Sequence, residues 1–293
     1  MKLLTSIIIF FMLAVISKSF SQDDSSEFWD EYWEPDSLAA LSTSQPTIDI
    51  LYGFGTPSFK DGVMTKNFAT VNTAEMKLGF TRKRTDLFRQ KAMGYKFTYF
   101  MISNLSTEWV PKSSIKNDLN SDSWRLGFGV SIGYGYNLGP TSDFVLYNSG
   151  NVFWSKYHFK DHPDSVQDEI ILRTFDDGKF RFGQSFEAGL KGEIFSPLSL
   201  NVSYERIIIY PRFMTWYWAG SEVMRGAGKA LVEYFTHKVI RASTGAGPIV
   251  NFILVNLYDY GAFELKKKYM DWPYMTAPPL IYDNFKFGLT FAF

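Results

Sequence analysis

Alternation of apolar and polar side chains is the dominant pattern along this chain, and it is clearest in residues 283–293. One face of that segment carries only large apolar residues, namely Phe285, Phe287, Leu289, Phe291 and Phe293. The intervening positions are polar or small. A period of two residues predicts a β-strand with one apolar and one polar face.

The same alternation recurs in eight other segments, which we expect to be strands. They are residues 48–55, 73–81, 95–101, 125–139, 144–159, 169–175, 179–194 and 198–209. In 95–101 the apolar face is formed by Tyr95, Phe97, Tyr99 and Met101. Asp176-Asp177-Gly178 has the composition of a tight turn between two of the strands. Because nine strands is an odd number, we expect residues 212–219 or part of the following segment to add another.

Helical spacing replaces alternation after Tyr210. The apolar positions of 221–237 predict one helix, and Pro248 followed by 249–268, with lysines at its end, predicts a second. A strand is the alternative for 249–260, because that apolar run contains β-branched residues. The pattern therefore divides the chain into a sheet of residues 46–210 plus 283–293 and a helical insertion of residues 211–282.

The N-terminal residues indicate export. Lys2 precedes an apolar run and then small residues, so we assign residues 1–21 to a cleaved signal peptide. The chain has no cysteine, which excludes a lipid-anchored cysteine and a disulfide framework. No later segment is apolar for the ~18 residues that a membrane helix needs. A membrane-embedded mature chain would therefore have to be a barrel.

Residues 22–45 are acidic and aromatic. We interpret them as a solvated periplasmic segment, with docking to a periplasmic protein, or capping of the barrel, as the alternatives. Over the whole chain, 30 Lys and Arg balance 30 Asp and Glu. This balance gives no indication of nucleic-acid binding.

An amphipathic closing strand that ends in Phe293 resembles that of the Gram-negative outer-membrane β-barrel proteins as a general class. The resemblance implies an all-β, antiparallel transmembrane barrel of about 8–10 strands in the cell outer membrane. It also implies contact with outer-membrane lipid, and recognition of Phe293 and the last strand by the barrel-assembly machinery. It covers architecture and location but not activity.

The polar faces of the strands would line the lumen. The residues expected there are Glu75, Lys77, Lys96, Arg125, Arg181, Glu187, Lys191, Glu193, Glu205 and Lys286. In a barrel this narrow, side chains nearly fill the interior, so we expect opposite charges to pair across it. A porin-like solute path is the alternative.

One strand has a face made largely of glycine, including Gly127, Gly129, Gly133 and Gly135. Glycine weakens a strand unless the wall must bend or another group approaches its backbone closely. We expect either curvature or close packing of a plug. Because the apolar faces of the inserted helices need burial, we predict that at least one helix folds into or over the barrel mouth against this face.

Catalytic and metal-binding signals are weak. The three histidines are in no recognisable catalytic motif, and only His237, four residues after Glu233, has a spacing that could hold a proton. No His, Cys or carboxylate spacing suggests a metal site or a cofactor. The sequence favours a structural or passive-transport barrel whose lumen is largely filled and is restricted by the insertion. An enzyme that modifies envelope lipids, or an assembly partner in an envelope complex, is the alternative.

Overall fold

The computed structural model describes residues 44–60, 63–88, 92–108, 118–139, 142–161, 163 and 165–293. The predicted signal peptide, residues 1–21, and nearly all of the acidic segment 22–45 lie outside these residues. Their assignments therefore stay predictions.

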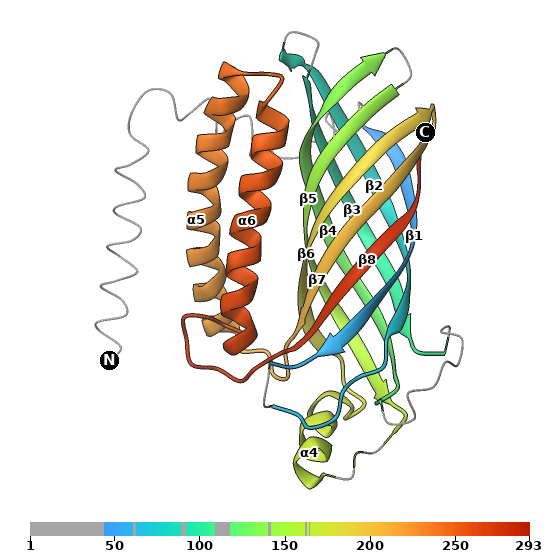
Figure 1. Ribbon diagram of the computed structural model, residues 1–293, viewed down its shortest axis with the longest axis vertical. Helices are drawn as coiled ribbons and strands as arrows, with labels where there is room; N and C mark the ends of the chain where they lie inside the picture. The colour runs from blue at the N-terminus through green and yellow to red at the C-terminus, as the bar shows by residue number, and fades with distance from the viewer. Residues whose placement is uncertain are drawn as a thin grey trace. The chain divides into compact units, whose positions relative to one another are not determined.

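Eight antiparallel strands form a closed barrel in which each strand pairs with its neighbours in sequence (Figure 1). The strands are β1 Gln45–Ser58, β2 Val71–Phe88, β3 Ala92–Ser106, β4 Ser121–Gly139, β5 Ser142–Phe159, β6 Arg181–Phe195, β7 Leu198–Ile209 and β8 Leu280–Ala292. The last strand closes the barrel on the first, with pairs that run from Thr47 and Ala292 to Ser58 and Ile281. The predicted barrel, with a helical segment before its last strand, is thus confirmed.

The outer face of the barrel wall is largely apolar, and buried charged residues lie inside it. On β1 the outward residues Ile50, Tyr52 and Phe54 are 54%, 41% and 49% exposed, whereas the inward residues Asp49 and Leu51 are both 2% exposed. This is the reverse of a water-soluble sheet, in which exposed faces are polar. Large apolar side chains are exposed in the same way on β2, β4 and β8.

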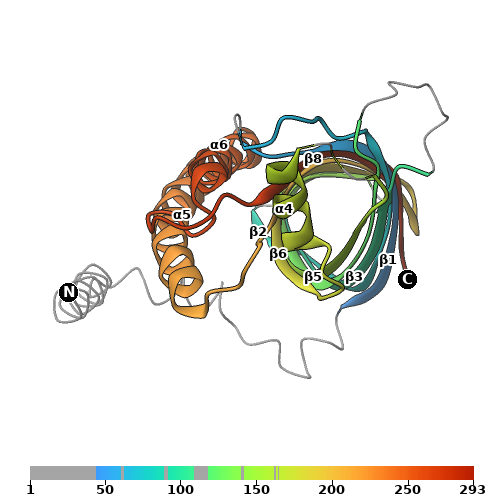
Figure 2. The same cartoon turned by 90° about the horizontal axis from the view of Figure 1, so that it is seen from below.

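The two ends of the barrel differ. At one end, short turns join β2 to β3, β4 to β5 and β6 to β7; at the other, longer connections join the remaining strands. A short helix, α4 Val166–Phe175, lies across the long-loop end (Figure 2). Its Leu172 and Phe175 are buried in an apolar cluster with Phe68, Phe153 and other residues of that end. This helix therefore covers the barrel mouth.

The strand predicted at 169–175 is wrong, because these residues belong to α4. The side chain of Ser165 caps the helix by accepting a hydrogen bond from the backbone N–H of Asp168, and Glu169 pairs with Arg173 one turn later. Gly178 then turns the chain into β6 with a φ of 77°. Removing this strand from the nine predicted gives the even number that the barrel contains.

Two antiparallel helices, α5 Thr215–Ala242 and α6 Gly247–Lys268, form a hairpin between β7 and β8. Pro248 lies in the first turn of α6, as predicted. The strand alternative for 249–260 is wrong because these residues are helical, and 212–219 adds no strand because α5 begins within it.

The hairpin lies along the outer wall of the barrel, where α6 contacts β4 and β5 (Figures 1 and 2). The hydroxyl of the outward-facing Tyr136 donates a hydrogen bond of 2.6 Å to the backbone oxygen of Gly245, in the hairpin turn. The side-chain amide of Asn148 likewise donates to Asn256 on α6. The prediction that the insertion is a plug or lid is therefore corrected, and the physical reason is that the outer wall also offers an apolar surface for burial.

In strand β3 the large aromatic residues Tyr95, Phe97 and Tyr99 face the lumen, whereas on the neighbouring strands many large apolar residues face outward. These three residues of β3 are at most 4% exposed, so the prediction that Lys96 faces inward is wrong. The inward glycines of β4 provide the room. A Cβ atom on Gly129 would lie 2.7 Å from the ring of Tyr99, and one on Gly133 would lie 2.7 Å from the Cα of Tyr147. The glycine face therefore accommodates bulky residues of the adjacent strands rather than a helix.

Replacement of Gly133 with Leu is expected to prevent barrel formation, because the new side chain would meet the backbone of β5. Gly192 is the matched control, since nothing lies within 4 Å of a Cβ built there. Refolding yield, measured as the fraction that shifts on gels after heating, should collapse for Gly133→Leu and stay near wild type for Gly192→Leu. Equal yields would contradict the packing role of the glycine face.

Candidate functional site

Six charged side chains from five strands meet in the middle of the lumen. They are Glu75, Lys77, Arg125, Glu187, Glu205 and Lys286, and each is at most 3% exposed. Lys286 Nζ lies 2.8 Å from a carboxylate oxygen of Glu75 and of Glu187. It also lies 3.1 Å from Glu205 Oε2. The last strand thus carries the cation that bridges three carboxylates.

The other two cations complete this central cluster. Arg125 contacts Glu75 at 3.1 Å and Glu205 at 3.2 Å, and its Nε donates to Ser103 Oγ at 2.7 Å. Lys77 contacts Glu187 at 2.8 Å. Three cations therefore face three carboxylates, so the central cluster carries no net formal charge.

A second, smaller cluster lies nearer the short-turn end. Lys191 Nζ lies 3.2 Å from Asp49 Oδ1 and donates to the hydroxyl of Tyr95 at 3.0 Å. Asn201 donates to Asp49 at 3.2 Å, and the hydroxyl of Tyr147 lies 2.7 Å from Asn201 Oδ1. The alternation of β1 and β7 places Asp49 and Asn201 at inward positions, although neither was among the predicted lumen residues.

The remaining predicted lumen residues lie near the two ends. Glu193 pairs with Lys83 at 2.7 Å beside the short turns, where a cavity of about 50 Å³ lies. Arg181 lies at the opposite end, where it contacts Asp177 at 2.8 Å and donates to the backbone oxygen of Pro211 at 2.7 Å. These two residues therefore belong to the rims of the barrel and not to the central cluster.

The weak catalytic candidates lie apart from the lumen. Glu233 and His237 are both on α5, in the hairpin. His158, near the long-loop end, is 68% exposed at its side chain and contacts Asp176 at 3.2 Å. His162 is outside the described residues. In the part of the chain that the structure describes, no three His, Cys, Asp or Glu side chains are grouped as metal ligands would be.

The hairpin has a polar interior and an apolar exterior. Arg225 on α5 contacts Glu222 at 2.8 Å and Asp259 of α6 at 3.4 Å, and Lys229 contacts the same Asp259 at 3.1 Å. Lys266 of α6 pairs with Glu222. Many large apolar side chains of the two helices are exposed, among them Trp216, Val223, Leu231, Phe235, Ile253 and Leu257. The ion pairs between the helices are thus inside the hairpin, whereas Lys238, Arg241 and Lys268 are exposed.

Among the described residues, no helix has the combination of length and apolar character that a membrane-crossing helix requires.

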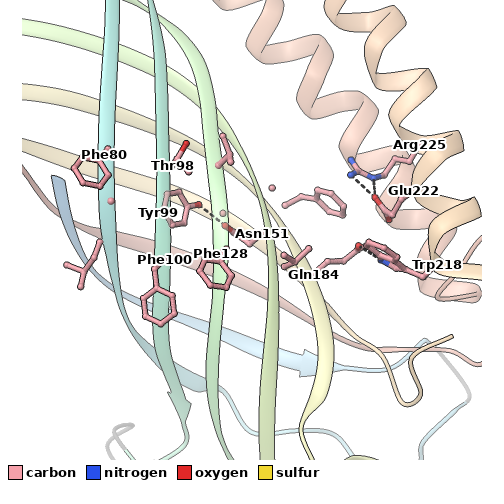
Figure 3. Close-up of a pocket in the computed structure, with 17 residues that line it drawn as sticks. Phe80, Thr98, Tyr99, Phe100, Phe128, Asn151, Gln184, Trp218, Glu222 and Arg225 are labelled. Carbon is pink, nitrogen blue, oxygen red and sulfur yellow. Dashed lines mark hydrogen bonds and ion pairs between the residues drawn. The ribbon is translucent and has the colours of Figure 1, made fainter. Parts of the chain in front are cut away.

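A groove of about 590 Å³ runs across the outer wall from β2 to the first turns of α5 (Figure 3). Most of its lining is apolar and comes from the outward faces of five strands, including Leu78, Phe80, Phe100, Phe128, Val130, Val152 and Phe186. At the hairpin end it is bordered by Gln184, Trp218, Glu222 and Arg225. Nothing in the sequence pattern indicated this groove, because it forms only where the hairpin meets the wall.

No family model and no curated protein matches this chain. Among solved structures, Neisserial surface protein A is similar over 85% of this chain and 97% of its own, with 8% identity and a TM-score of 0.39. Ail, the attachment invasion locus protein of Yersinia pestis, is similar over 85% of this chain and 99% of its own, with 8% identity and a TM-score of 0.31.

Substitution of Lys286 is expected to destabilise the barrel strongly. Lys286→Met leaves three buried carboxylates with two cations, and breaking a buried ion pair in this way typically costs about 3–5 kcal/mol in the free energy of unfolding. Lys83→Met is the control, because Lys83 forms its ion pairs at the partly exposed rim and its loss should cost less than about 1 kcal/mol. Urea unfolding of the detergent-solubilised protein measures both. A similar cost for the two variants would show that the central cluster has no special role.

Asp271 is a buried carboxylate in the loop between α6 and β8. Its side chain is not exposed, and neither carboxylate oxygen has a hydrogen-bond partner among the described residues. Burial raises the pKa of Asp271 to about 6, with Glu222 acting in the same direction and Lys266 opposing it. The folded protein therefore holds a proton that the unfolded chain, with an ordinary pKa of about 3.9, releases at lower pH.

The stability that Asp271 contributes should be fully present below about pH 4 and lost as the pH rises through about 6. Asp271→Asn should remove this dependence, since an amide does not ionise. Unfolding midpoints of wild type and variant, compared at several pH values between 4 and 7, measure the difference. A difference that stays constant over this window would exclude the titration of Asp271.

Proposed function

We propose that this protein is an integral outer-membrane β-barrel with a closed lumen, and that its role is structural rather than the passage of solutes. The single observation that carries the proposal is the reversed polarity of the wall. A belt of exposed Phe, Leu, Ile, Val, Tyr and Trp side chains surrounds an interior of buried charges. Such a surface is stable in hydrocarbon and unfavourable in water.

The closed lumen is supported by two layers of packing. The central cluster crosses the lumen from β2 to β6 and from β4 to β7, so its side chains occupy the path that a solute would take. Helix α4 covers the long-loop end with buried apolar residues. Eight strands enclose an interior just wide enough for side chains to fill. These features favour a structural barrel over the porin-like alternative.

The hairpin extends the apolar belt on one side of the barrel. Many of its exposed residues, such as Leu231 and Leu257, are apolar, and Arg225 and Asp259 pair with each other in its interior. Arg206 on the outer wall also pairs with Glu264 of α6 at 3.1 Å. We therefore propose that the barrel holds the outer face of the hairpin against the surrounding lipid.

Membrane integration is tested by fractionation. The protein should stay in the membrane pellet after washing with high salt and with carbonate, because hydrophobic contact does not depend on ionic strength. It should also migrate differently on gels before and after heating, as a folded barrel does. Release by either wash, together with unchanged migration, would contradict the proposal.

Conductance in planar bilayers tests the closed lumen. Wild-type protein should give no single-channel steps, and neither should a variant in which a short Gly-Ser linker replaces residues 215–268, because the hairpin lies outside the barrel. A porin incorporated under the same conditions serves as the positive control. Regular conductance steps from the wild type would support a solute path. Steps from the deletion variant alone would show that the hairpin blocks the lumen, which contradicts its position outside the barrel.

A further inference from the structure

The groove beside α5 has a polar end and an apolar length. Its floor and sides on β2 to β5 are formed mostly by apolar outward side chains, of which Phe80, Phe128 and Val152 are 47%, 57% and 37% exposed. Apart from Thr98 on β3 and the lumen-facing Tyr99 and Asn151, its polar side chains lie at the hairpin end, as Figure 3 shows for Gln184, Glu222 and Arg225. Binding pockets for small molecules have this composition, with mostly apolar walls and a few polar groups that fix orientation.

A buried hydrogen-bond donor at the polar end lacks a partner. Gln184 is only 3% exposed, and its Oε1 accepts a hydrogen bond of 3.4 Å from Trp218 Nε1. Because an indole nitrogen only donates, the side-chain atom of Gln184 that faces Trp218 must be the oxygen. The amide nitrogen of Gln184 therefore points away from this contact. Gln184 Nε2 has no hydrogen-bond partner among the described residues. A buried amide of this kind favours a ligand that supplies an acceptor.

The charges beside Gln184 indicate which acceptor fits. Arg225 is paired with Glu222 and Asp259, and its guanidinium also lies 4.7 Å from the centroid of the Phe186 ring. The polar end therefore presents no unpaired cation to a strongly anionic group. A neutral acceptor such as an ester carbonyl matches the Gln184 amide without disturbing these pairs.

One outward glycine leaves the middle of the groove open. Gly150 of β5 pairs with Val130 of β4 on one side and with Phe186 of β6 on the other, and nothing lies within 4 Å of a Cβ built on it. Gly150 is therefore not required for packing of the wall. A larger side chain at this position would occupy the groove itself.

From this geometry we propose that the groove is a binding site for one glycerophospholipid. An acyl chain lies along the apolar length over Gly150, and an ester carbonyl accepts a hydrogen bond from Gln184 Nε2. A lipid is the occupant, rather than a water-soluble ligand, because the groove opens into the exposed apolar belt. The inference rests on the proposed membrane location and adds a defined site to it.

Native mass spectrometry of the delipidated protein in a non-ionic detergent tests the site. Titration with palmitoyl-oleoyl phosphatidylethanolamine should give one saturable lipid adduct. Gly150→Phe should weaken that adduct roughly tenfold or more, because its ring fills the groove. Gly192→Phe, at an outward glycine with equally open space outside the groove, should bind like the wild type.

The donor is tested separately by Gln184→Met, which keeps the length of the side chain and removes the amide. Its affinity should fall roughly threefold to tenfold, as expected for the loss of one hydrogen bond. This variant and the smaller Gly150→Ile carry the test if Gly150→Phe does not fold. The heat-dependent gel shift establishes folding for each preparation.

Two results would overturn the lipid site: adducts that do not saturate, or equal binding by Gly150→Phe and Gly192→Phe. Failure of this inference is distinguishable from failure of the proposed function. If the protein resists carbonate extraction but shows none of the expected lipid binding, only the lipid site is overturned. If carbonate releases the protein, the proposed membrane location and the lipid site are both overturned.

Discussion

The cancellation of charge inside a narrow, closed wall is the constraint on which the rest of the structure depends. An ion taken out of water costs several kcal/mol unless its partners are in place. Here the partners come from strands that are distant in sequence, since Glu75 of β2 meets Lys286 of β8. The central cluster is therefore complete only when the barrel is closed, so closure and charge pairing stabilise each other.

The strands with regular alternation were predictable because large apolar side chains face outward at alternate positions and the charged side chains between them face inward. This holds for β1, β2, β4 and β8, and it placed Glu75, Lys77, Arg125 and Lys286 on the polar faces. It failed for β3, where Tyr95, Phe97 and Tyr99 face inward. Periodicity gives two faces but does not say which is outside. The inward glycines of β4 indicate which face of β3 is inside, because they leave space in the lumen for large side chains such as Tyr99.

The other differences arise where apolar spacing alone does not determine the structure. Residues 169–175 are apolar enough for a short strand, and what selects the helix is local: the cap at Ser165 and the ion pair from Glu169 to Arg173. The insertion was correctly predicted as two helices, but the side of the wall on which it lies could not be predicted. An apolar helical face is satisfied by a lumen, a wall or lipid, and spacing does not distinguish among them. The groove forms only because the hairpin lies on the outer wall, so the sequence around Gln184 and Gly150 did not indicate a binding site.

The hairpin also changes the entropy of closing the barrel. Strand β8 follows β7 only after the whole insertion, yet Ile209 and Leu280 are paired neighbours at the long-loop end. A flexible segment of this length would impose a loop-closure cost that grows with the logarithm of its length. Two antiparallel helices bring their outer ends together, so the effective loop shrinks to the connections 210–214 and 269–279. The folded hairpin therefore lets the last strand pair with β7 at a lower entropic cost than a flexible insertion of the same length would allow.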